Sequence, residues 1–124
     1  MTAVDPTVTR AFVDAVVARD FAGARALLAP DVEFRSMTPS RFWEADEPEG
    51  VEAALRAWLD DPGREVDRIE PTQPGAVQDT VRMGWRVSGT RAEGAFVFEQ
   101  QAFARERDGR IVWLRVMCSG PRDA

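Results

Sequence analysis

The pair Asp108-Gly109 constrains the fold of this chain more than any other feature of the sequence. It separates two long runs rich in Phe, Val, Ile and Trp, residues 95–107 and 110–118. An Asp-Gly pair between apolar runs favours a tight β-hairpin turn, because the turn needs positive φ angles that Gly and Asp tolerate. The sequence therefore predicts a long antiparallel hairpin in its last third.

The first arm of this hairpin has two faces, because successive residues of a strand point to opposite sides. One face carries Val97, Glu99, Gln101 and Phe103, and the other carries Phe96, Phe98, Gln100 and Ala102. A carboxylate and an amide therefore lie side by side on one face of a strand that is otherwise strongly apolar.

Three segments place apolar residues at helical spacing. Asp5-Pro6 suits the start of the first helix, as N-cap and first helical residue, and the apolar stripe runs to about Arg19. Asp20 caps a short second helix, and Pro30 lies just beyond its end. The third helix is predicted over residues 51–59.

The other segments are predicted as strands and loops. Residues 31–37, 64–70 and 76–88 have the composition or alternation of strands. Residues 38–50 are rich in Pro and charge and contain Phe42-Trp43, so we predict a loop with an aromatic anchor. Helices followed by a set of long antiparallel strands indicate an α+β fold, and the length fits one domain over residues 1–124.

The chain has no His, no Lys and no Tyr. These absences remove the commonest general base, the Schiff-base amine and the phenolic proton donor. Any acid or base chemistry must therefore use Asp, Glu or the single cysteine, Cys118. We expect no metal site and no cofactor, because His is missing and no Walker or Rossmann glycine pattern occurs.

Charge and hydropathy restrict the partners. The net charge is −5 and the arginines are scattered, so we expect no nucleic-acid binding. No apolar run approaches the roughly 20 residues that span a bilayer, and residues 1–12 lack the pattern of a secretory signal. We therefore expect no membrane partner. Because Cys118 cannot form an internal disulfide, it agrees with a reducing compartment, and we expect a cytoplasmic protein.

Three stretches together resemble a known family: AFVDAVVARDFAGARALLAPDVEF, GVEAALRAWL and DGRIVWLRV. They are similar to the NTF2-like superfamily, and within it to the SnoaL-like and ketosteroid-isomerase-like proteins, from about Val8 to Ser119. The resemblance implies an NTF2-like cone, with three N-terminal helices packed on a strongly curved mixed or antiparallel sheet. It also implies an internal pocket open at the wide end and a homodimer formed through the outer sheet face.

The resemblance does not carry the isomerase chemistry with it. In an ungapped match of local motifs, the isomerase tyrosine, general-base aspartate and protonated aspartate fall on Phe12, Ser36 and Gln101. The last-strand aspartate of the limonene-epoxide-hydrolase type falls on Val116. None of these four residues has the required group, so we expect neither catalytic set.

Glu99 and Gln101 are the candidate functional pair. The match turns Gln101 into the cone, and strand alternation then puts Glu99 on the same side. A carboxyl group in an apolar pocket can have its pKa raised towards neutrality, which suits a general acid or base. In the alternative interpretation, Glu99 pairs with an arginine such as Arg115 or Arg86 at the pocket rim or at a dimer face.

The remaining pocket candidates are apolar walls, a hydroxyl and a thiol: Phe12, Ser36, Trp58, Trp85, Val116 and Cys118. The aromatic residues can line a pocket or simply fill the core. Ser36 can hydrogen-bond either a ligand or the backbone at the end of its strand. Cys118 would need a cation beside it to act as a nucleophile, and is otherwise a buried inert thiol.

Three kinds of function are compatible with these features. The first is a module that binds a small, largely apolar molecule carrying a few oxygens. The second is a cyclase, isomerase or dehydratase in which Glu99 moves a proton. The third is a dimeric structural or interaction protein whose exposed sheet face, with Phe96, Phe98 and Trp113, forms the contact.

Overall fold

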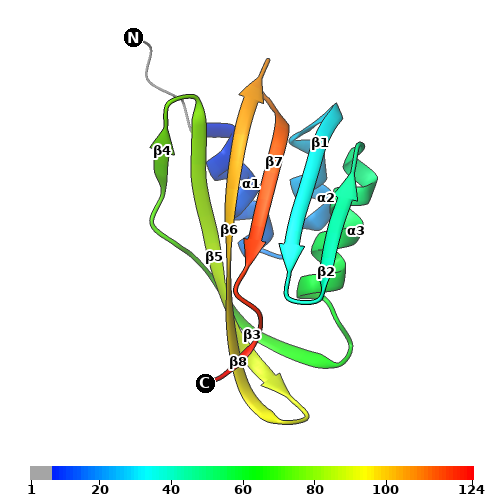
Figure 1. Cartoon of the computed structure of the whole chain (residues 1–124), viewed down its shortest axis with the longest axis vertical. Helices are drawn as coiled ribbons and strands as arrows, with labels where there is room; N and C mark the ends of the chain where they lie inside the picture. Colours follow the sequence, from blue (N-terminus) through cyan, green and yellow to red (C-terminus); the bar gives the residue numbers. More distant parts are fainter. Residues whose placement is uncertain (1–6) are drawn as a thin grey trace.

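The computed structural model describes residues 7–124, so the helix start predicted at Asp5-Pro6 lies outside the described residues. Within residues 7–124 the chain forms three helices and eight strands. All three helices lie on the same face of the sheet (Figure 1). This arrangement confirms the predicted α+β fold.

The helices are α1 (Thr7–Val17), α2 (Phe21–Ala26) and α3 (Pro48–Leu59). The first ends earlier than expected because Arg19 has a φ of 60°, and the N–H groups of Arg19 and Asp20 bond back to carbonyls of the last helical turn. Asp20 then caps α2, as predicted, by accepting a 2.9 Å hydrogen bond from the Gly23 N–H.

The strands are β1 (Leu28–Thr38), β2 (Arg41–Ala45), β3 (Arg64–Pro71), β4 (Gly75–Val77), β5 (Thr80–Arg91), β6 (Gly94–Arg107), β7 (Arg110–Cys118) and β8 (Arg122–Asp123). They form one sheet in the order β2-β1-β7-β6-β5-β3, with β4 on β5 and β8 on β6. Among these pairs β1 and β7 are parallel and the others are antiparallel, so the sheet is mixed. The long strands β5 and β6 extend beyond the ends of β1 and β7 into a lower arm that β3 and β8 complete (Figure 1).

The hairpin predicted from Asp108-Gly109 is confirmed as β6 and β7. Asp108 has a φ of 54° and Gly109 a φ of 78°, the two positive values that a tight two-residue turn requires. Arg107 pairs with Arg110 directly across the turn. The local chemistry of two residues therefore fixes the register next to the turn, and a bulge between Arg105 and Glu106 shifts it by one residue along the rest of the hairpin.

Two of the predicted segments differ from the structure. Residues 38–50, predicted as a loop, contain β2, which pairs with β1, and the first turn of α3. The charged residues of this segment masked its strand pattern, but Trp43 and Ala45 are partly buried and pack against the core, while Glu44 between them is exposed. Residues 76–88 form a hairpin of β4 and β5 rather than one strand, with a turn in which Gln78 has a φ of 53°.

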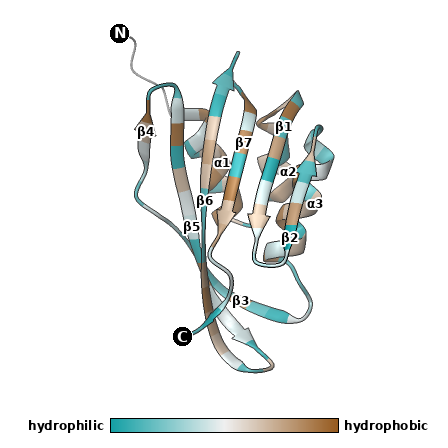
Figure 2. Ribbon diagram, in the orientation of Figure 1, coloured by the Kyte–Doolittle hydropathy of each residue, from teal (hydrophilic) through white to brown (hydrophobic). Residues whose placement is uncertain are grey.

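The core lies between the sheet and the helices. On the sheet the alternation of hydrophobic and hydrophilic residues is visible along β1 and β7 (Figure 2). Helix α1 packs over β5 and β3, and α3 packs over β1 and β2. The inner residues of β1 and β5 are those expected from the alternation: Val32, Phe34 and Ser36, and Val81, Met83, Trp85 and Val87. None of the helices within residues 7–124 has the length and apolarity of a membrane span.

Candidate functional site

The orientation of β6 decides which polar side chains can reach an internal pocket. Phe96, Phe98, Gln100 and Ala102 are buried on the inner face. Glu99 and Gln101 therefore lie on the outer face, and their predicted inward orientation is wrong. The motif match turned Gln101 inward, but the burial along β6 puts its neighbour Gln100 inside, and in a strand a difference of one residue moves a side chain to the opposite face.

Glu99 lies in a polar cluster on the outer face. Its carboxylate accepts hydrogen bonds from Arg86 Nη2 at 3.1 Å and from Gln101 Nε2 at 3.0 Å. The side chains of Glu99 and Arg86 are 35% and 62% exposed. The alternative interpretation of Glu99, an ion pair with Arg86, is thus confirmed. A role of Glu99 as acid or base stays a prediction.

Gln100 is the polar residue that β6 places inside. It has no exposed surface, and its Oε1 accepts a 2.7 Å hydrogen bond from Trp85 Nε1 across the β5-β6 pair. This bond fixes the amide orientation, because the indole N–H can only donate. The Gln100 Nε2 group is left buried with no hydrogen-bond partner among the described residues.

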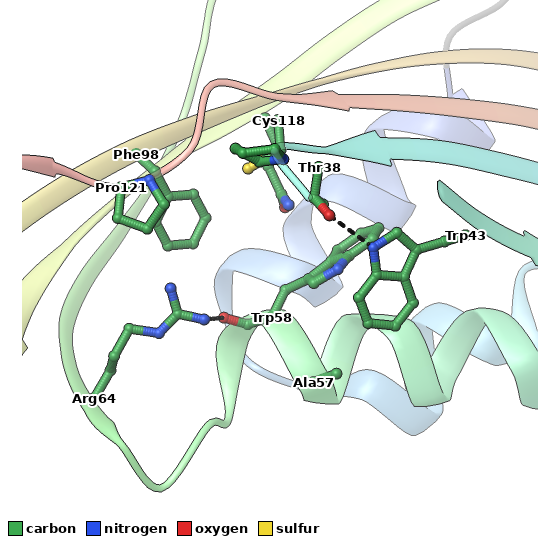
Figure 3. A pocket seen from close by; sticks show the side chains of 10 residues that line it. Thr38, Trp43, Ala57, Trp58, Arg64, Phe98, Cys118 and Pro121 are labelled. Carbon is green, nitrogen blue, oxygen red and sulfur yellow. Dashed lines mark hydrogen bonds between the residues drawn. The ribbon is translucent and has the colours of Figure 1, made fainter. Parts of the chain in front are cut away.

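A cavity of about 210 Å³ opens beside Gln100, between the C-terminal half of α3, the end of β1, β2 and the inner face of the central strands. Ten residues line it: Thr38, Pro39, Trp43, Ala57, Trp58, Arg64, Phe98, Gln100, Cys118 and Pro121. Figure 3 shows Trp43 and Trp58 on one side, and Phe98 and Pro121 on the other. Aromatic walls with a few polar atoms are typical of small-molecule sites.

The walls of this cavity are held by contacts among the lining residues. Trp43 meets Trp58 edge to face, with ring centroids 5.5 Å apart. The Trp43 indole N–H donates a 2.9 Å hydrogen bond to Thr38 Oγ1, drawn as a dashed line in Figure 3. Since Trp43 belongs to β2 and Trp58 to α3, the aromatic contact fixes the helix against the sheet edge.

Three lining residues carry a buried nitrogen that lacks a hydrogen-bond partner among the described residues: Trp58 Nε1, Arg64 Nε and Gln100 Nε2. All three atoms are donors. A buried donor without an acceptor costs about 1–3 kcal/mol, so proteins usually satisfy such groups.

Arg64 enters the cavity from the start of β3, directly after the Pro62-Gly63 turn. Its Nη2 donates a 3.2 Å hydrogen bond to the Trp58 carbonyl and lies 3.6 Å from Asp61 Oδ2. The guanidinium carbon is 5.4 Å from the centroid of the Phe98 ring. Figure 3 shows the guanidinium between Phe98 and Trp58, so a positive charge lies at the cavity wall.

The other predicted pocket residues divide into two groups. Trp58 and Cys118 line the cavity, as expected. Phe12, Ser36, Trp85 and Val116 are buried on the inner side of the sheet but are not among the lining residues. The Cys118 thiol is free, and its Sγ accepts a hydrogen bond from the Gly120 N–H at 3.4 Å.

Gln100, Arg64 and Trp43 line the cavity but were not predicted as site residues from the sequence. Gln100 could have been found only by knowing which face of β6 is inside, since both faces of that strand carry apolar residues. Trp43 was predicted only as part of an aromatic anchor and Arg64 not at all, because each reaches the cavity from a strand or turn whose position depends on the tertiary fold.

The outer sheet face differs from the prediction as well. Phe96 and Phe98, expected on that face, are buried inside, with ring centroids 6.0 Å apart. Three exposed apolar residues of the outer face, Met37, Phe42 and Met117, lie in one row across β2, β1 and β7. They line a surface groove of about 290 Å³ together with Phe103 and the flanking Arg35 and Arg115.

Comparison with protein families gives one result. A family model described as "SnoaL-like domain" matches residues 9–114. No curated protein matches the chain. The matched region contains most of α1, all of α2 and α3, and most of the sheet, including eight of the ten residues that line the cavity.

Several solved structures have a similar fold. A loop truncation variant of IdmH is 18% identical with a TM-score of 0.69, covering 93% of both chains. A hypothetical protein from Catenulispora acidiphila with a ketosteroid isomerase-like fold, in complex with trimethylamine, is 16% identical with a TM-score of 0.68, covering 91% of this chain and 85% of that one. A limonene-epoxide-hydrolase-like epoxide hydrolase from M. tuberculosis is 18% identical with a TM-score of 0.63, covering 91% and 80%. At these identities the likeness concerns the fold.

Proposed function

Because this chain belongs to the family of SnoaL-like domains, we propose that it binds a small, largely apolar ligand in the cavity beside α3. It does so without the catalytic residues of the ketosteroid isomerases, because Phe12 and Ser36 lack the required phenol and carboxyl groups, and Gln100 and Gln101 on β6 are both amides. The solved structures of similar fold include a complex with trimethylamine and an epoxide hydrolase, so this fold accommodates both binding and chemistry.

The observation that carries this proposal is the cavity with unpaired donors. A cavity of roughly 150 Å³ with apolar walls accepts a benzene molecule. The volume of about 210 Å³ beside Gln100 therefore suits a ligand of one ring with substituents. The buried Trp58 Nε1 and Gln100 Nε2 atoms offer hydrogen bonds to one or two ligand oxygens.

A thermal-shift and calorimetric screen of one- and two-ring aromatic compounds tests the proposal. Ala57 lines the cavity at the exposed surface of α3, so Ala57→Trp should fill its entrance and abolish binding. Ala53 is also exposed on α3 but does not line the cavity, which makes Ala53→Trp the matched control. Equal binding by both variants, or no stabilisation of the wild type by any compound, would contradict a ligand site in this cavity.

A second proposal is a homodimer formed through the outer sheet face, favoured by the exposed row of Met37, Phe42 and Met117. These residues are 53%, 56% and 52% exposed, unusually high for large apolar side chains on a sheet. The two arginines beside the groove would border an apolar interface centre with a polar rim.

A cytoplasmic location remains part of the proposal and is supported by the free thiol of Cys118.

A further inference from the structure

The polar groups around the cavity are mostly hydrogen-bond donors rather than free acceptors. The unpaired buried atoms of the lining residues are donors, and one of them belongs to a guanidinium group. Among the residues that the structure describes, no aspartate or glutamate lines the cavity. Thr38 Oγ1 and Gln100 Oε1 already accept hydrogen bonds from Trp43 and Trp85. The cavity therefore offers donors and a positive charge, with its side-chain acceptors already occupied.

Arg64 has hydrogen-bonding capacity to spare at this wall. A guanidinium has five N–H donors. The contacts of Arg64 with the Trp58 carbonyl and with Asp61 both use Nη2. The Asp61 contact is 3.6 Å long and its carboxylate is 43% exposed, so it compensates the charge only in part. Nε is buried and lacks a partner among the described residues.

From this geometry we propose that the cavity selects the anion of a small aromatic carboxylic acid, with the ring between the aromatic walls and the carboxylate against Arg64. The inference rests on the proposed binding function and specifies its ligand class. A carboxylate supplies the acceptors that the guanidinium fork pairs with best. The unpaired N–H groups of Trp58 and Gln100 bond any further oxygen on the ring.

The overall charge of the protein argues against a non-specific attraction of anions. The net charge is −5, so the long-range field repels an anionic ligand. A preference for acids over neutral analogues must therefore come from a local group, and Arg64 is the cation that lines the cavity wall within the described residues. A hydrogen bond to a charged group contributes about 1.5–3 kcal/mol, which corresponds to a preference of about tenfold or more.

The experiment compares matched acids and primary amides by calorimetry at pH 7: benzoate, phenylacetate, trans-cinnamate and 2-naphthoate, each against its amide. The proteins are the wild type, Arg64→Gln, and Arg68→Gln, which removes the same charge from the exposed part of β3. We expect the wild type and Arg68→Gln to bind at least one acid about tenfold more tightly than its amide. Arg64→Gln should lose this preference and bind the acid and its amide with about equal affinity.

Each other outcome has a definite meaning. Amides that bind the wild type as tightly as the acids overturn the selectivity for anions and leave the proposed binding function intact. An acid preference that persists in Arg64→Gln overturns the role of Arg64. If neither acids nor amides bind the wild type, both this inference and the binding function fail. Circular dichroism and thermal unfolding of Arg64→Gln establish that it is folded, and the acid-to-amide ratio is then independent of its stability.

Discussion

The indole N–H of Trp85 donates a 2.7 Å hydrogen bond to the side-chain oxygen of Gln100, and neither side chain has exposed surface. The bond joins the inner faces of β5 and β6 at the level of the cavity. It also holds the amide so that its other end, Nε2, has no acceptor among the described residues. The hydrogen bond from Trp85 to Gln100 Oε1 thus leaves Gln100 Nε2, at the other end of the same amide, as an unpaired donor.

The coupling between these two side chains can be measured with a double-mutant cycle. Gln100→Leu leaves the Trp85 N–H unpaired, and Trp85→Phe leaves the Gln100 oxygen unpaired, whereas the double variant leaves neither. The summed losses in the free energy of unfolding should exceed the loss in the double variant by about 1–3 kcal/mol. Urea unfolding of the four proteins measures this difference. The matched control pairs Trp85→Phe with Gln101→Leu on the outer face, and additive effects in the Gln100 cycle would contradict the coupling.

Glu99→Gln should change little. The ion pair with Arg86 lies at the surface, and such pairs contribute about 0–1 kcal/mol. Because Glu99 is on the face opposite the cavity, the variant should bind cavity ligands with unchanged affinity. Calorimetry and urea unfolding check both expectations. Loss of ligand binding, or of turnover once a substrate is known, would instead return Glu99 to the functional site.

The decrease in the free energy of unfolding at acid pH should depend partly on two ion pairs made by residues of β1. A hydrogen bond from Arg107 lowers the pKa of Asp31, and one from Arg115 lowers the pKa of Glu33. A carboxyl group with a lowered folded-state pKa stabilises the fold above its ordinary pKa, near 4, and loses this contribution as the pH falls through the folded-state pKa. The advantage of the wild type over the double variant Asp31→Asn/Glu33→Gln should therefore be constant near neutrality and vanish in acid.

Chemical unfolding of both proteins between neutral pH and strong acid measures this effect. The exposed Asp67 provides a control for the loss of a negative charge, as Asp67→Asn. Because both pairs are exposed, the effect should be small. An advantage of the wild type that grows as the pH falls would have the wrong sign and would contradict the assignment.

The exposed row of Met37, Phe42 and Met117 on the outer sheet face predicts that the protein is a dimer. Met117→Glu places a charge at the β7 end of the row formed with Met37 and Phe42 and should convert a dimer to a monomer. Val77→Glu is the control, because Val77 is 70% exposed and lies on β4, which pairs with β5 and is far along the sheet from β1 and β7. Light scattering at micromolar concentration distinguishes the two states. A monomeric wild type would remove the proposed dimer.

Much of the fold follows from local patterns. The turn at Asp108-Gly109 needs two positive φ angles, and the Asp20 cap needs one acceptor for the first turn of α2, so each acts within a few residues. The third helix and most of the strands follow from spacing of apolar residues in the same way. β2 escaped detection, because the pairing partner that makes residues 41–45 a strand is supplied by β1.

The candidate site illustrates the limit of such patterns. Alternation determined that Glu99 and Gln101 share one face of β6 and that Gln100 lies on the other. Both faces of that strand carry apolar side chains, so hydrophobicity did not distinguish inside from outside. Registry with Trp85 on β5 and Cys118 on β7 turned Gln100 inward.

By itself, the sequence determined that this chain forms an α+β fold without His, Lys or Tyr chemistry, because helix caps, tight turns and residue composition are local properties. Only the tertiary structure decided that Gln100, Arg64 and Trp43 meet at one cavity, because these side chains come from three separate strands. Their meeting depends on strand register and helix packing, which are set by the burial of the whole core.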